Sequence, residues 1–121
     1  MHYLLLVVHE RGDKPEEWIS DMMEPFRWSE HDLHPDFYWD NWVIGGRWDG
    51  GIPGNTCPIE EWPDHFMPSR LLAGGLPISL YGDWEDHAPP TAEQLKMASL
   101  RREKIIDRYP GHMISVVDYH N

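Results

Sequence analysis

Apolar residues fall into four short runs that predict β-strands. His2–His9 is almost continuously apolar, which is typical of a strand buried on both faces. Phe37–Ile44 is rich in aromatic residues and predicts a second strand, and Leu76–Tyr81 predicts a third. His112–His120 carries isoleucine and valine residues at its centre and predicts the last strand.

Two other segments repeat apolar residues at three- and four-residue steps, which predicts amphipathic helices. We expect Asp13 to cap the first helix and Pro25 to end it. In the second helix, Thr91 and Gln94 form a capping box, and Pro110 follows the end. The inward face of the first helix comprises Trp18, Ile19, Met22, Met23 and Phe26, and that of the second comprises Leu95, Ala98, Arg102, Ile105 and Tyr109. The aliphatic stem of the arginine in this second group is expected to lie along the core.

The order strand, helix, strand, strand, helix, strand predicts an α+β fold of the ferredoxin-like, split βαβ type. We therefore expect an antiparallel sheet with the first and last strands near its centre and both helices on one face. The length of the chain predicts a single domain, residues 1–121. Residues 50–75 contain many glycines and prolines without a period, so we expect a long irregular loop there, of a length that is often functional.

The composition favours a soluble, cytoplasmic protein. Cys57 is the only cysteine, which excludes an internal disulfide, and no basic neighbours mark it as a nucleophile. The apolar run Leu4–Val8 is too short for a signal sequence or a membrane span. Seven tryptophans supply buried area in a chain whose mean hydropathy is -0.60.

The net charge is -11, and it is distributed unevenly. Residues 1–95 carry 18 acidic and 5 basic residues, whereas residues 96–121 carry 3 acidic and 5 basic ones. An acidic surface repels nucleic acid and anionic membranes, so we expect neither as a direct partner. The same surface suits a basic protein partner, or imitates nucleic acid in a groove that binds phosphates, or simply keeps the protein soluble.

The acidic positions of the first helix and the loop after it are the candidate partner-binding residues. Carboxylates recur there every few residues, so they could bind a channel rich in lysine and arginine rapidly and with marked salt dependence. They are Asp13, Glu16, Glu17, Asp21, Glu24, Glu30, Asp32 and Asp36.

An alternative site begins at Gly45-Gly46-Arg47-Trp48. Glycines can turn backbone N–H groups toward an anion, and arginine can pair with a phosphate or carboxylate. The segment could therefore bind a nucleotide-type ligand, although it matches neither a Walker loop nor the GxGxxG spacing. The other interpretation is a bulged strand whose Arg47 pairs with a neighbouring carboxylate.

A third group of residues comes from strand ends. Asp118 and His120 alternate, so they share a sheet face, and His9 could approach them if the first and last strands are close. A carboxylate with two imidazoles can form an acid–base pair or a metal site. His31 and His34 have a metal-ligand spacing but lack further ligands, so we interpret them as solvated loop residues and expect no cofactor.

Three segments resemble small, poorly characterised proteins encoded by phages, prophages and some bacteria. They are Gly45-Gly46-Arg47-Trp48-Asp49-Gly50, Gly82-Asp83-Trp84 and Val117-Asp118-Tyr119-His120. The resemblance implies an origin in a mobile element and brings no established activity.

The leading hypothesis is an interaction protein without catalytic activity, acting in the cytoplasm of a host cell. Its partner would be a basic, nucleic-acid-handling host complex, such as a CRISPR-Cas defence complex that a phage-encoded inhibitor blocks. The competing hypothesis is nucleotide binding or metal-dependent hydrolysis by Arg47, His9, Asp118 and His120. A structural component of a virion, or a housekeeping structural protein, is a third possibility.

Overall fold

The two apolar runs at the ends of the chain pair with each other at the centre of the sheet. A computed structural model describes residues 2–10, 14–27, 39–81 and 89–120. The strands are β1 (His2–His9), β2 (Asn41–Ile44), β3 (Thr56–Pro58), β4 (Arg70–Ala73), β5 (Leu76–Ser79) and β6 (Met113–His120). The helices are α1 (Pro15–Met23) and α2 (Ala92–Arg108), and neither is long and apolar enough to cross a membrane.

The sheet has the order β2-β6-β1-β4-β5. β1 and β6 are antiparallel over their whole length, so the central position expected for the first and last strands is confirmed. β1 and β4 are parallel, and the sheet is therefore mixed. The α+β class is confirmed, but the antiparallel ferredoxin-like arrangement is wrong, because β4 was not recognised and takes the place beside β1.

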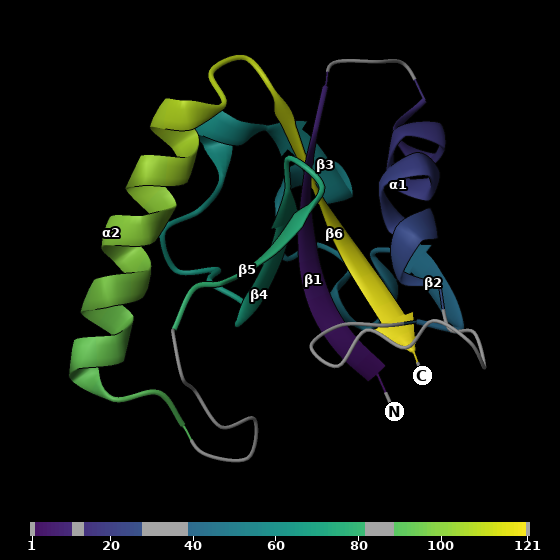
Figure 1. Cartoon of the computed structure of the whole chain (residues 1–121). Helices are drawn as coiled ribbons and strands as arrows, with labels where there is room; N and C mark the ends of the chain where they lie inside the picture. Colours follow the sequence, from purple (N-terminus) through teal and green to yellow (C-terminus); the bar gives the residue numbers. More distant parts are fainter. Residues whose placement is uncertain (1, 11–13, 28–38, 82–88, 121) are drawn as a thin grey trace.

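The two helices cover opposite faces of the sheet (Figure 1). Leu5 and Val7 of β1 belong to the core cluster under α1, whereas Leu6 and Val8 belong to the cluster that includes α2. The expectation of both helices on one face is therefore wrong. The continuously apolar sequence of β1 is the physical reason, since a strand buried on both sides requires a layer on each.

Residues 50–75 form a structured part of the core rather than the expected irregular loop. They contain β3 and β4, and they bury Ile52, Ile59 and Trp62 almost completely. Arg102 of α2 lies over the Trp62 ring, with its guanidinium carbon 5.3 Å from the ring centroid, and donates a hydrogen bond to the Trp62 carbonyl. This contact confirms that Arg102 lies against the core. It also connects α2 to residues 50–75, which contain Trp62.

β2 and β3 pair with the same edge of β6. Ile44 is opposite Val117, and Thr56 is opposite Ser115. Between them the Gly45 N–H donates to the Val116 carbonyl at 2.9 Å, which continues the ladder. The two strands therefore act as one edge strand that is interrupted by residues 45–55.

The helix ends match the sequence patterns in part. Thr91 and Gln94 form the predicted capping box at the start of α2. α1 begins at Pro15 after Lys14, which makes no side-chain cap, and the expected cap Asp13 lies outside the described residues. A 3-10 turn containing Pro25 ends α1, as the proline predicts. The Phe37–Ile44 prediction is confirmed for β2 alone, because residues 37 and 38 are outside the described ranges.

Cys57 provides a test of this core. The side chain is 3% exposed, and its burial, reinforced by the negative charge of Glu61, raises the pKa of the thiol to about 11. At pH 8 only about one thiol in a thousand is then ionised, and the thiolate is the reactive form. We expect Ellman's reagent to modify native Cys57 at least about 100-fold more slowly than the denatured protein. If native Cys57 were labelled as rapidly as free glutathione at the same pH, the burial of Cys57 in this core would be contradicted.

Candidate functional site

The glycine turn at Gly45–Trp48 closes around Asp118. The carboxylate is 4% exposed, and its Oδ2 accepts a hydrogen bond from the Arg47 backbone N–H at 3.0 Å. Its Oδ1 lies 2.7 Å from Nδ1 of His2. The protein's own carboxylate thus occupies the position in which an anionic ligand would meet this turn. Since this backbone N–H is already occupied by Asp118, the geometry disfavours the nucleotide-site interpretation of the turn.

Gly46 is required by the close approach of the turn to Asp118. Its φ is +55°, in the left-handed region that favours glycine. A Cβ atom at this position would lie 2.4 Å from Oδ2 and 2.6 Å from Cβ of Asp118. The carboxylate and the turn therefore approach each other closely only when residue 46 has no side chain.

The Arg47 side chain is exposed, and it has no ion pair or hydrogen bond within the described residues. Within the described residues it is the backbone N–H of Arg47, and not its guanidinium, that meets a carboxylate, that of Asp118. Downstream, Asn55 braces the same loop by accepting from the Gly50 N–H at 2.8 Å and donating to Asp49 at 2.5 Å. Gly45, Gly46 and Trp48 thus belong to a loop that is held by hydrogen bonds to Asp118 and Asn55.

Asp118 and His120 lie on one sheet face, as their alternation predicts. In the antiparallel pairing of β1 and β6, His2 lies opposite His120, and the two ring centroids are 5.2 Å apart. Nδ1 of His120 lies 2.8 Å from Oδ1 of Asp40. His2, Asp118 and His120 border a hollow of about 260 Å³ that Trp42 also lines. An imidazole held by a carboxylate is suited to proton transfer, but the described residues contain no group of three or more potential ligands placed to hold a metal ion.

His9 does not join this cluster. The β1–β6 register pairs His9 with Met113, at the opposite end of β6 from His120, and alternation places it on the other face. Its Nε2 lies 2.7 Å from Oγ of Ser115, which lies 2.7 Å from Oγ1 of Thr56. A serine bonded to a histidine resembles a nucleophile and its base, but Ser115 is fully buried and out of reach of substrate. The expected combination of His9 with Asp118 and His120 is therefore wrong.

Of the predicted partner-binding residues, four are described, three of them on the exposed side of α1 and the fourth, Glu24, at the start of the 3-10 turn that follows it. Glu16, Glu17, Asp21 and Glu24 are exposed, whereas Ile19 and Met23 are buried. Asp13, Glu30, Asp32 and Asp36 lie outside the described residues. The helix thus presents carboxylates outward, as the amphipathic pattern predicts.

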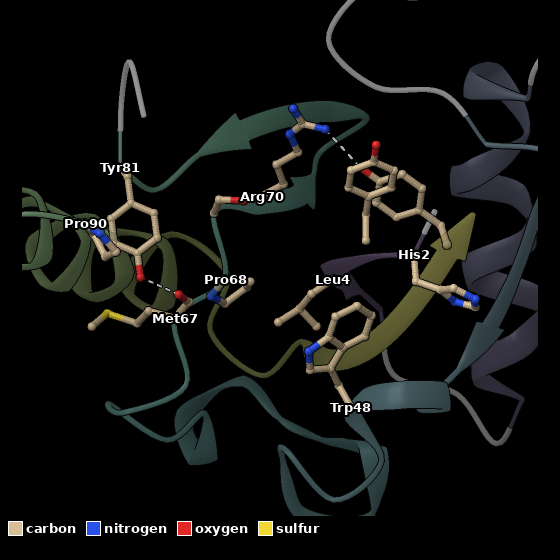
Figure 2. A pocket seen from close by; sticks show the side chains of 11 residues that line it. His2, Leu4, Trp48, Met67, Pro68, Arg70, Tyr81 and Pro90 are labelled. Carbon is tan, nitrogen blue, oxygen red and sulfur yellow. Dashed lines mark hydrogen bonds between the residues drawn. The ribbon is translucent and has the colours of Figure 1, made fainter. Parts of the chain in front are cut away.

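A second concave surface, which we call the aromatic cleft, was not foreseen from the sequence. It has a volume of about 480 Å³ and lies where β1 and β4 begin. Figure 2 shows the side chains around it. They are His2, Tyr3, Leu4, Trp48, Met67, Pro68, Ser69, Arg70, Tyr81, Pro90 and Tyr119. These residues come from six separate segments, so no local spacing could have indicated the cleft.

Comparisons of the chain with protein-family models, with curated proteins and with solved structures give no match. The resemblance of the glycine segment to phage-encoded proteins therefore stays a prediction.

Gly46 and Gly50 offer a matched test of the turn, because both have positive φ but only Gly46 contacts another side chain. We expect Gly46→Ala to lower the free energy of unfolding by roughly 2–4 kcal/mol, since left-handed alanine and overpacking both cost energy. Gly50→Ala should cost about 1–2 kcal/mol, because its Cβ would meet open space. Urea unfolding measures both. Equal losses would show that the approach to Asp118 is unimportant.

The buried network at His9 predicts a pH dependence. Burial is the main cause that lowers the pKa of His9 below its ordinary 6.5, with a smaller contribution from His112. The unfolded chain therefore binds a proton near pH 6.5 while the native protein does not, so the stability contributed by neutral His9 is lost as the pH falls below that value.

The substitution His9→Gln removes this titration while leaving an amide that can hydrogen bond. We expect the wild type to be more stable than the variant at pH 7.5, and the difference to shrink as the pH is lowered to about 5.5. Urea unfolding of both proteins across this pH range measures the difference between their free energies of unfolding. The contributions of the other titrating groups are the same in both proteins and cancel in this difference. A difference in stability that does not change with pH would contradict a lowered pKa for His9.

Proposed function

We propose that this protein binds a basic surface of a partner protein through the exposed carboxylates of α1. The observation that supports the proposal is that Glu16, Glu17 and Asp21 of α1, and Glu24 just after its end, are exposed while the apolar side of the helix is buried. Such carboxylates attract lysine and arginine side chains and accelerate association with a basic surface.

The cations near these carboxylates neutralise them weakly. Lys14 lies 3.7 Å from Glu17, and Arg27 lies 3.9 Å from Glu24, with all four side chains more than 60% exposed. Exposed pairs of this kind contribute about 0–1 kcal/mol, and a competing partner can replace them. Glu16 and Asp21 form no ion pair with any described residue.

The net charge of the protein limits the class of partner that it can bind. A protein of net charge -11 repels nucleic acid directly but complements the basic channels of proteins that handle nucleic acid. The resemblance of the Gly45–Gly50 segment to phage-encoded proteins favours an inhibitor of a host defence complex as the form of this activity.

A charge-reversal pair on α1 tests the proposal. We expect Glu16→Lys/Asp21→Lys to weaken partner capture from host lysate at least about tenfold, because two contacts become repulsive. Capture by the wild type should also fall when the salt is raised from about 50 to about 500 mM.

Glu103→Lys/Asp107→Lys is the matched control, since it makes the same charge change on exposed positions of α2. This control should retain partner capture. Capture that ignores both salt and the α1 substitutions, or that both variants reduce equally, would refute a specific role for α1.

A further inference from the structure

We propose that His2 and His120 bind one zinc ion through their Nε2 atoms. The two residues lie opposite each other in the antiparallel pairing of β1 and β6, so their side chains leave the sheet on the same face. Neither residue belongs to α1, so the site is distinct from the exposed carboxylates of that helix. Imidazole is the commonest metal ligand among protein side chains, and it suits zinc.

Each imidazole is oriented by a carboxylate through the ring nitrogen that the metal would not use. Nδ1 of His2 lies 2.7 Å from Oδ1 of Asp118, and Nδ1 of His120 lies 2.8 Å from Oδ1 of Asp40. An ionised carboxylate can only accept a hydrogen bond, so each Nδ1 carries the proton and each Nε2 of the neutral ring keeps a lone pair. Metal-binding histidines almost always have this arrangement, in which the second ring nitrogen donates to a carboxylate, a carbonyl or water.

The two Nε2 atoms are accessible to an ion. Neither forms a hydrogen bond with any residue in the described ranges. The side chains of His2 and His120 are 36% and 43% exposed, and both residues border the hollow of about 260 Å³. An ion from solution can therefore reach both rings in the folded protein.

The separation of the two rings fits one shared ion. Zinc lies about 2.0–2.1 Å from a ligating imidazole nitrogen and prefers tetrahedral geometry. Two imidazoles that bind one ion in this way have ring centroids about 5 Å apart. The centroids of His2 and His120 are 5.2 Å apart, and the ring planes are inclined at 67°, so the rings do not stack face to face. This spacing allows both rings to ligate the same ion.

The site supplies two protein ligands, so water completes the coordination of the ion. Structural zinc sites have four protein ligands, and catalytic sites commonly have three. We therefore expect zinc to bind more weakly here than in those sites and to exchange readily. The carboxylates of Asp40 and Asp118 behind the two rings, together with the net charge of -11, favour the binding of a cation.

Isothermal titration calorimetry of the full chain with zinc chloride tests the proposal. We expect a Kd below about 100 µM. His2→Gln and His120→Gln should each weaken binding at least about tenfold, because glutamine can still donate to the carboxylate but lacks the ligating nitrogen. Asp40→Ala should weaken binding at least about tenfold, since the partners that orient metal-binding histidines contribute about 10–100-fold to metal affinity.

Two control variants remove histidines elsewhere in the chain. His65 lies 3.9 Å from Asp64 and is 80% exposed, so His65→Gln removes another imidazole beside a carboxylate, one that does not line the hollow. His31→Gln/His34→Gln removes the other histidine pair with a metal-ligand spacing. Both variants should retain the wild-type Kd.

Magnesium is the control for the chemistry of the ligands. About 5 mM Mg²⁺ should leave zinc binding unchanged, because Mg²⁺ prefers oxygen ligands. Displacement of zinc by Mg²⁺ would show that carboxylates, and not imidazoles, hold the ion.

Nitrogen NMR of the imidazoles identifies the ligand atoms. Zinc should shift the Nε2 resonances of His2 and His120, while their Nδ1 atoms stay protonated. Histidines that only support the sheet would show no such shift.

Three further results would overturn the proposal. They are a Kd of about 100 µM or weaker, an unchanged Kd in both His2→Gln and His120→Gln, and zinc-induced shifts confined to other histidines. Thermal unfolding shows whether each variant is folded. If a histidine variant is not, Asp40→Ala and the NMR spectra of the wild type still test the site. Glu16→Lys/Asp21→Lys should bind zinc normally, so a failure of the α1 proposal is distinguishable from a failure of this one.

Discussion

The buried carboxylate of Asp118 is the interaction on which the arrangement of this molecule depends most. It joins three parts of the chain, because β6 carries it, β1 supplies His2 and the glycine turn supplies the Arg47 N–H. A buried carboxylate is tolerated only when hydrogen bonds replace those it made with water. Asp118 obtains both of its bonds from segments that must be in place at the same time, so the central strand pair and the turn support each other.

The sequence was sufficient for features that depend on local spacing. The capping box of α2 and the outward acidic side of α1 each follow from residues within one element. The shared face of Asp118 and His120 was also predictable, because alternation along a strand is a local property.

Long-range features were not predictable from these patterns. β4 has four residues between glycine- and proline-rich segments, and its parallel pairing with β1 depends on a crossover that no local period encodes. His9 was wrongly grouped with Asp118, because proximity of two strands does not fix which of their ends meet. The aromatic cleft combines Trp48, Arg70 and Tyr81, whose relation exists only after the sheet forms.

The interruption of the edge strand has a consequence for how such a protein can diversify. Since β2 and β3 are each anchored to β6, and the backbone at Gly45 and Arg47 is hydrogen-bonded to β6, variation that keeps this pairing is confined to the solvent-facing side chains of residues 45–55. Trp48 lies in this interruption and also forms a wall of the aromatic cleft. Substitutions at Trp48 could therefore reshape one wall of the cleft, while the pairing of β2 and β3 with β6 remains intact.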